Sequence, residues 1–173
     1  MKAKKYLMIH ADDAGLACSE NLATQQGMLK GSINSTSLMV PCPWFYEMAQ
    51  FAIKNPSLDF GIHLTLTGEW KTYPFRPITP VNQIPSLVDK NGYFLPKREY
   101  IRDHAVLEEV RLELKNQIEF AISLGMKPSH LDSHMYTRIK VLVGDYQPIY
   151  DSEAVCKYVT KHIGKEGLFN PII

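Results

Sequence analysis

Short apolar runs alternate along the chain with longer segments in which apolar residues recur every three or four positions. The runs predict strands, which cover residues 6–9, 35–40, 58–66 and 130–134. The longer segments predict helices, which cover residues 19–30, 44–54 and 104–124. Gly31 and Gly125 directly follow two of these helices, where glycine commonly ends a helix. Because strands that alternate with helices pair in parallel through right-handed crossovers, the sequence predicts an α/β fold.

The segment 67–103 shows neither kind of periodicity. It contains five prolines, at positions 74, 77, 80, 85 and 96, together with aromatic residues such as Trp70 and Phe75. A long irregular segment inside a compact domain is usually functional, often as a lid or as one wall of a site. Its aromatic side chains either present flat faces to a ligand or anchor the segment itself, and the sequence leaves both interpretations open.

Three of the predicted strands end in side chains that can bind a metal ion. The first runs into Asp12 and Asp13, the third contains His63, and the last is HLDSH at 130–134. Two adjacent carboxylates after a buried run are unfavourable unless a counter-charge keeps them ionised. The carboxyl ends of parallel strands form one edge, so these groups are expected to converge there. Two imidazoles and one carboxylate bind a divalent metal and leave positions open for water or substrate.

Alternation along the last strand puts His130, Asp132 and His134 on one face, which we expect to look into the site. Each signal also has a simpler interpretation. A single histidine at a strand end is usually structural, and an aspartate pair after a first strand also occurs in receiver domains, which bind Mg²⁺. The segment 34–37 (NSTS) is either a polar wall of the site or turn chemistry. The remaining histidines are interpreted as structural or solvated: His10, His104 and His162.

Composition excludes several classes of function. Lys plus Arg number 19 and Asp plus Glu number 18, and the dispersed basic residues argue against a nucleic-acid partner. No apolar run approaches the length of a membrane span, so no membrane partner is expected. The cysteines Cys18, Cys42 and Cys156 lie far apart, which favours buried thiols in a reducing compartment over disulfides. We therefore expect a cytoplasmic protein.

Four motifs of the chain occur together in a known protein family. In chain order they are IHADDAG, GSINSTSLMV, GIHLTL and KPSHLDSH. In this order and at these separations they resemble the YdjC-like carbohydrate deacetylase family, which includes the chito-oligosaccharide deacetylases. The resemblance covers roughly residues 6–134. It implies a (β/α) barrel-like fold, incomplete or irregular, and a metal-dependent removal of acetyl groups from N-acetylated sugars.

The resemblance also implies roles for individual residues. Asp13, His63 and His134 match the metal ligands, and Asp12 matches the general base. Two further residues are expected to orient these ligands from behind: His130 and Asp132. The implied cofactor is a divalent ion, magnesium or zinc. The implied partner is a small N-acetylated sugar, and a homodimer is left open.

The match assigns no proton donor for the departing amine, and His130 and His162 are the first candidates. Family members are usually longer, so residues 1–173 are expected to form one deacetylase-like domain that is shortened or truncated at its C-terminal end. General acid help contributes about 10²–10⁴-fold, so this chain is expected to bind metal yet deacetylate slowly. The alternatives are a metal- and sugar-binding protein without turnover and a receiver-like Mg²⁺-binding domain.

Overall fold

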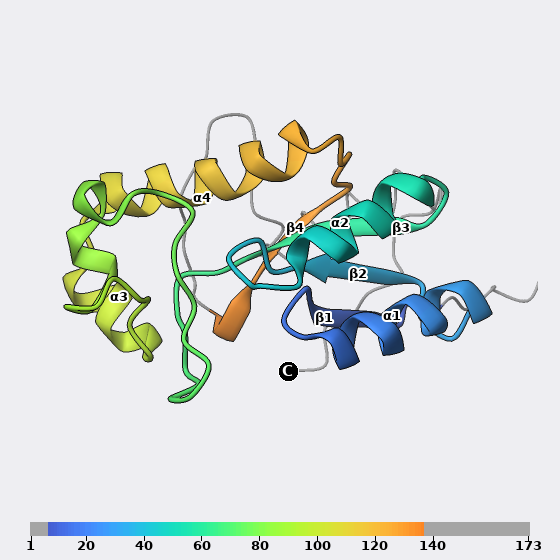
Figure 1. The fold of residues 1–173 in the computed structure, drawn as a ribbon, viewed down its shortest axis with the longest axis horizontal. Coiled ribbons are helices and arrows are strands. Elements are labelled where there is room, and N and C mark those ends of the chain that lie inside the picture. Colours follow the sequence, from blue (N-terminus) through green and yellow to red (C-terminus); the bar gives the residue numbers. More distant parts are fainter. Residues whose placement is uncertain (1–6, 137–173) are drawn as a thin grey trace, which may run out of the picture.

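Four parallel strands form the sheet in the described part of the chain. The computed structural model describes residues 7–136. Its strands are β1 (His10–Ala14), β2 (Ser35–Leu38), β3 (Asp59–Leu64) and β4 (Leu131–Ser133). They lie in the order β1-β2-β3-β4, and each neighbouring pair is parallel (Figure 1). The predicted α/β class is confirmed, whereas the described strands do not test whether a barrel closes.

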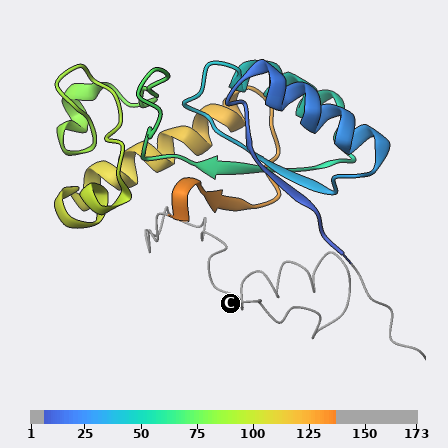
Figure 2. The ribbon, with the colours of Figure 1, turned by 90° about the horizontal axis from the view of Figure 1, so that it is seen from below.

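The three longest helices lie on one side of this sheet. Helix α1 (Cys18–Lys30) connects β1 to β2, α2 (Phe45–Lys54) connects β2 to β3, and α4 (Leu107–Ser123) precedes β4. Because the strand order follows the chain order without reversal, right-handed crossovers bring all three helices to the same side, as Figure 2 shows. Within residues 7–136, no helix combines the length and the hydropathy that a membrane crossing requires.

The first strand begins later than its apolar run predicts. The run predicts a strand at 6–9, but Leu7 and Ile9 are 79% and 45% exposed, and β1 begins at His10. In β1, His10 instead pairs with Ser35 of β2. One face of β1 carries polar side chains, so its pattern is not that of a buried strand. Hydrophobicity alone therefore misplaces this strand.

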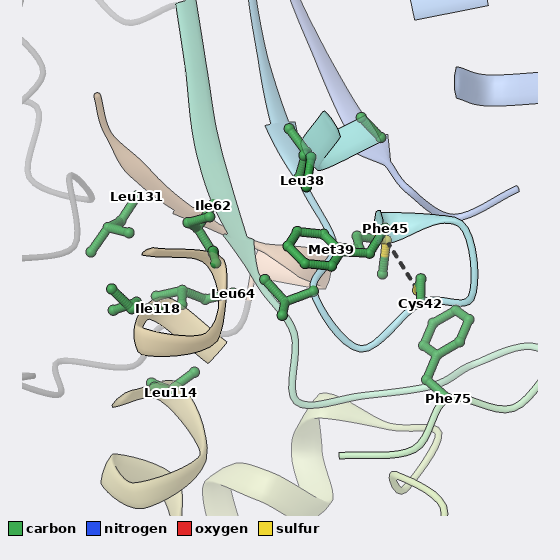
Figure 3. Close-up of a cluster of buried hydrophobic side chains, with 14 of the residues drawn as sticks. Leu38, Met39, Cys42, Phe45, Ile62, Leu64, Phe75, Leu114, Ile118 and Leu131 are labelled. Atoms are coloured by element: carbon green, nitrogen blue, oxygen red, sulfur yellow. Dashed lines mark hydrogen bonds between the residues drawn. The ribbon is translucent and has the colours of Figure 1, made fainter. Parts of the chain in front are cut away.

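Apolar side chains pack between the sheet and the helices. Figure 3 labels these buried residues: Leu38, Met39, Cys42, Phe45, Ile62, Leu64, Phe75, Leu114, Ile118 and Leu131. Cys42 is buried as expected and Cys18 is half-buried, whereas Cys156 lies outside the described residues. The core residues of β2, β3 and β4 alternate with polar ones, which therefore point to the opposite side of the sheet.

The irregular segment 67–103 contains three short helices. They are two 3-10 helices, η1 (Val81–Gln83) and η2 (Pro85–Leu87), and α3 (Arg98–His104). The extended backbone of Ala105 and Val106 separates α3 from α4, so the helix predicted from residue 104 begins at 107. Phe75 and Phe94 are buried, whereas Trp70 is 53% exposed. The first two anchor the segment, and Trp70 remains available as a flat surface.

Polar side chains of α4 hold the irregular segment in place. The buried Glu113 carboxylate accepts hydrogen bonds from the backbone N–H groups of Ile78 and Thr79, at 3.1 and 2.9 Å. One turn later, Gln117 accepts from the N–H of Thr65 and donates to its carbonyl oxygen, at 3.0 and 2.7 Å. These bonds join the segment to the same helix that packs on β3.

Replacing Glu113 by alanine is expected to destabilise the fold. Two backbone N–H groups lose their acceptor, and each buried unsatisfied group costs about 1–3 kcal/mol. The midpoint of urea unfolding should fall accordingly. The matched control is Glu119→Ala, on an exposed position of the same helix, which should stay within about 0.5 kcal/mol of the parent. Equal midpoints for the two variants would show that Glu113 does not hold the segment.

Candidate metal centre

Three side chains from three strand ends meet at the carboxyl edge of the sheet. Asp13 belongs to β1, His63 belongs to β3, and His134 directly follows β4. Their donor atoms all lie within 4.8 Å of one another. Asp13 Oδ1 is 3.2 Å from His63 Nε2 and 3.1 Å from His134 Nδ1. The sequence predicts these three residues as ligands, and the structure brings them together; we call them the metal centre.

The backbone is strained beside two members of the metal centre. Asp13 has a φ of 61°, and Met135, which follows His134, has a φ of 56°. Residues other than glycine rarely adopt this left-handed region, and those that do cluster at functional sites. At Asp13 the strain coincides with a register shift between Ala11 and Ala14 in the pairing of β1 with β2. Such an irregularity re-aims a side chain at the end of a strand.

A half-buried carboxylate, that of Asp132, orients His63 from behind. His63 Nδ1 is 2.7 Å from Asp132 Oδ1, and Ser37 Oγ donates a hydrogen bond of 2.6 Å to Asp132 Oδ2. With Nδ1 directed at Asp132, the other ring nitrogen is the one that faces Asp13. Metal-binding histidines usually show this arrangement, in which a carboxylate fixes the tautomer and the ring orientation. The expected orienting role of Asp132 therefore has a geometric basis.

Glu69 is a site residue that the sequence reasoning missed. Its Oε2 lies 3.0 Å from His134 Nε2, on the opposite side of the ring from Asp13. His134 thus has a carboxylate behind it, just as His63 does. Glu69 stands at the start of the irregular segment, where no periodicity marks its orientation. The feature of the sequence that could have indicated Glu69 is its position shortly after β3, at the edge of the sheet where the predicted ligands converge.

His10 also belongs to the site, which corrects its interpretation as a structural or solvated residue. Its Nδ1 is 2.9 Å from Ser35 Oγ, and its Nε2 is 3.0 Å from Asp132 Oδ2. The same Nε2 is 3.3 Å from Asp12 Oδ1, whose side chain is 63% exposed. His10 therefore connects the predicted general base with the carboxylate behind His63.

The other histidines lie in different surroundings. His104 is exposed, with its ring 5.5 Å from that of Tyr100, in agreement with the solvated interpretation. His130 lies at the start of β4, with Nδ1 2.8 Å from Ser129 Oγ. Its ring packs against that of His10 at 5.2 Å, so its part in orienting the metal ligands stays a prediction. His162 lies outside the described residues.

The segment 34–37 supports the interpretation as a polar wall. Asn34 Oδ1 accepts a hydrogen bond from the N–H of Ile9, 25 positions earlier in the chain, so this contact is not turn chemistry. Ser35 and Ser37 point instead to the polar side of the sheet, where both hydroxyls contact His10. The serines of β2 thus form part of the polar wall.

Electrostatic coupling keeps the carboxylates of this site ionised. Burial raises the pKa of Asp13, but hydrogen bonds from His134 and His63 outweigh it and hold that pKa well below its usual range. The pKa of Asp132 is lowered in the same way against its burial, by His10 and His63. Burial lowers the pKa of His63, yet hydrogen bonds to Asp13 and Asp132 outweigh it and raise the pKa to about 9. Without a metal, His63 is therefore protonated at neutral pH.

The donor chemistry of the metal centre fits a divalent cation. One carboxylate and two imidazoles supply negative charge and nitrogen donors, a set typical of first-row transition ions with open positions for water. A carboxylate behind each imidazole meets the usual second requirement of such sites. Mg²⁺ prefers oxygen ligands, so of the two metals implied by the resemblance the donor set favours zinc.

Metal affinity is expected to rise with pH up to about 9. Below the raised pKa of His63, which is about 9 in the metal-free protein, a metal ion has to displace a proton. Each displaced proton changes the affinity by about tenfold per pH unit. Titration calorimetry of Zn²⁺ in buffers of different ionisation enthalpy measures the protons released. An affinity that does not change between pH 6 and pH 9 would contradict the assignment.

Comparison with known proteins identifies the family of this chain. A family model described as YdjC-like protein matches residues 6–147, a stretch that contains every member of the metal centre. The chain belongs to the YdjC-like family. This membership confirms the resemblance drawn from the four motifs. A receiver-like domain would leave His63 and His134 without a role. Family membership therefore removes the main support for that alternative.

Curated relatives from bacteria include proteins with named activities. A carbohydrate deacetylase of Thermoanaerobacter pseudethanolicus is 34% identical over 134 residues, covering 78% of this chain and 51% of that protein. A carbohydrate deacetylase of Thermus thermophilus is 39% identical over 132 residues, with coverages of 76% and 44%. A chitooligosaccharide deacetylase of Yersinia enterocolitica is 33% identical over 140 residues, with coverages of 79% and 51%. The chain thus spans about half the length of these YdjC-like relatives.

A solved structure supports the fold of this YdjC-like chain. It is a crystal structure from Enterococcus faecalis V583, of a protein whose name proposes cellobiose-phosphate cleavage. The two superpose with a TM-score of 0.65 at 31% sequence identity, over 92% of this chain and 57% of that one. The similarity supports the arrangement of parallel strands and flanking helices.

Proposed function

We propose that the protein is a metal-dependent hydrolase that removes the acetyl group from N-acetylated sugars such as chito-oligosaccharides. The observation that carries this proposal is the convergence of Asp13, His63 and His134 at one edge of the sheet in a YdjC-like chain. Relatives named carbohydrate deacetylase support the reaction class. Because the chain spans about half of their length, the activity of the whole protein is part of the proposal.

The metal centre has the groups needed to hold the cofactor. Asp13 supplies the negative charge, and the two histidines supply nitrogen donors whose rings are oriented by Asp132 and Glu69. A divalent ion held there would lower the pKa of its water to about 7 and would polarise the acetyl carbonyl. The residues around the centre then have to bind the sugar and move protons.

Asp12 is suited to act as the general base. Its side chain is 63% exposed, and its carboxylate converges with His63 and Asp132 rather than with Asp13 and His134. An exposed carboxylate there can accept the proton of the attacking water. The acetyl carbon gains the hydroxyl oxygen, the amide C–N bond breaks, and the amine leaves with a proton. The products are acetate and a free amino sugar.

The start of the irregular segment is suited to bind the sugar. Glu69 contacts His134, and the next residue, Trp70, is 53% exposed. The hydroxyl of Tyr73 donates a hydrogen bond of 2.8 Å to the carbonyl oxygen of Leu16, which fixes this wall beside α1. An exposed indole close to the metal centre offers a flat apolar surface to a sugar ring, in support of the ligand-facing interpretation.

Acetate release from N,N′-diacetylchitobiose tests the proposal directly. The protein is loaded with Zn²⁺, then stripped with EDTA, then reloaded, and N-acetylglycine serves as a non-sugar amide. We expect acetate from the sugar alone, lost on stripping and restored on reloading. Binding of the sugar and the metal without acetate would favour the binding-protein alternative. Turnover that survives stripping would refute the metal dependence.

A further inference from the structure

A second group of metal donors lies on the polar side of the sheet, beside the metal centre and in contact with it through His63 and Asp132. It consists of His10 on β1, Asp132 on β4 and His130 at the start of β4, and we call it the distal cluster. The donor atoms of these three residues also lie within 4.8 Å of one another. All three side chains are partly buried, so they form an enclosed group and not a row of surface charges.

Both imidazoles of the distal cluster are held by serine hydroxyls. His10 Nδ1 is 2.9 Å from Ser35 Oγ, and His130 Nδ1 is 2.8 Å from Ser129 Oγ. The two rings meet edge to face with centroids 5.2 Å apart. A histidine ligand typically uses one ring nitrogen for the metal and the other for a hydrogen bond that fixes its orientation. Both rings of the distal cluster have such a bond at Nδ1.

The carboxylate of the distal cluster is fixed as well. Ser37 Oγ donates a hydrogen bond of 2.6 Å to Asp132 Oδ2, and the same oxygen lies 3.0 Å from His10 Nε2. The other oxygen, Oδ1, is 2.7 Å from His63 Nδ1. One carboxylate therefore faces a ligand of the metal centre with one oxygen and the distal cluster with the other.

Gly61 leaves the space that the distal cluster needs. A Cβ atom at this position would overlap the ring of His130. Gly61 precedes His63 by two residues on β3, so both positions face the polar side of the sheet. The backbone of β3 thus admits an imidazole beside the strand where other residues would exclude it.

The donor atoms of the distal cluster lie close to the separation that a single bound ion requires. Bonds of about 2.0–2.2 Å to nitrogen and oxygen place the donors of one ion about 3–4 Å apart. Small side-chain rotations bring donors now within 4.8 Å to that separation.

We propose that His10, His130 and Asp132 bind a second divalent cation of the nitrogen-preferring class, such as Zn²⁺, Co²⁺ or Ni²⁺. Two imidazoles with one carboxylate select such ions over Mg²⁺ and Ca²⁺, which prefer oxygen donors. The proposal does not depend on the deacetylase reaction. It requires only that the polar side of the sheet binds one further ion in addition to the one in the metal centre.

The test is a count of bound Zn²⁺ by equilibrium dialysis and elemental analysis at saturating metal. The wild-type chain should bind two ions, and His130→Gln should bind one. His134→Ala, which removes a ligand of the metal centre alone, should also bind one. The double variant should bind none. His104→Gln removes an exposed imidazole of α3 and is the matched control, which should still bind two ions.

Two results would overturn the second site. One is a single ion in the wild type that His134→Ala abolishes and His130→Gln leaves in place. The other is two ions retained by His130→Gln. If circular dichroism shows that His130→Gln is unfolded, His10→Asn replaces it, because asparagine keeps a hydrogen-bonding group for Ser35. A wild type without any bound ion refutes both assignments, whereas a single ion that depends on His134 alone refutes only the second site.

Discussion

Replacing His63 by alanine should remove one equivalent of bound metal from the protein and leave the fold intact. Its Nε2 lies 3.2 Å from Asp13, at an edge of the sheet rather than in the core, so few apolar contacts are lost. His134→Ala should behave in the same way. Loss of a ligand should exceed the roughly 10–100-fold drop in affinity that follows removal of an outer partner. Glu69→Gln, which changes only such a partner, should fall within that range.

Titration calorimetry with Zn²⁺ ranks these variants, and circular dichroism confirms that each is folded. His104→Ala, on the exposed side of α3, is the control that should bind as the parent does. Undiminished metal in His63→Ala or His134→Ala would remove the basis of the metal centre. An affinity of Glu69→Gln equal to that of the parent would show that this carboxylate only neighbours His134.

The two adjacent aspartates should respond differently to the same substitution. Asp13→Asn should weaken metal binding, because a neutral amide oxygen replaces a carboxylate that converges with two imidazoles. Asp12→Asn should keep the metal and lose turnover by about 10²–10⁴-fold, the usual contribution of a general base. The measurement pairs acetate release with bound Zn²⁺ in the same samples.

A third carboxylate supplies the control for these two variants. Asp103 is a surface residue that pairs with Arg102 on α3, and Asp103→Asn should change neither metal binding nor turnover. Equal loss of metal in Asp12→Asn and Asp13→Asn would show that the two side chains do not have separate roles. Full turnover by Asp12→Asn would remove it as the base.

The sequence predicts the part of the site that follows from strand order and alternation. His63 lies in an apolar run, which is strand β3 in the structure. The alternation in HLDSH puts Asp132 on the same face as its two histidines, and the structure has strand β4 there. Because the strands are parallel, their carboxyl ends lie at the same edge of the sheet. Local pattern and one topological rule are enough for these residues.

The rest of the site depends on contacts that no local pattern encodes. His10 is 122 positions from Asp132 in the chain, and Glu69 is 65 positions from His134. The apolar run at 6–9 led to a strand predicted too early in the chain. Strand β1 itself has a polar face, and its sequence pattern is therefore closer to that of a turn. The direction of the Asp13 side chain depends on a left-handed backbone φ of 61°. An aspartate can adopt this conformation, but its presence in a sequence does not predict it.

The hydrogen bond between Glu69 and His134 joins the irregular segment 67–103 to the proposed metal centre. This segment contacts α4 through Glu113, and its Glu69 lies 3.0 Å from His134. A molecule that shifts this segment therefore alters the surroundings of His134. Linkage makes the effect reciprocal: whatever factor a bound sugar adds to metal affinity through this contact, the metal adds to sugar affinity. Under the proposed function, a sugar that strengthens metal binding through this contact is therefore bound more tightly, by the same factor, when the metal is present.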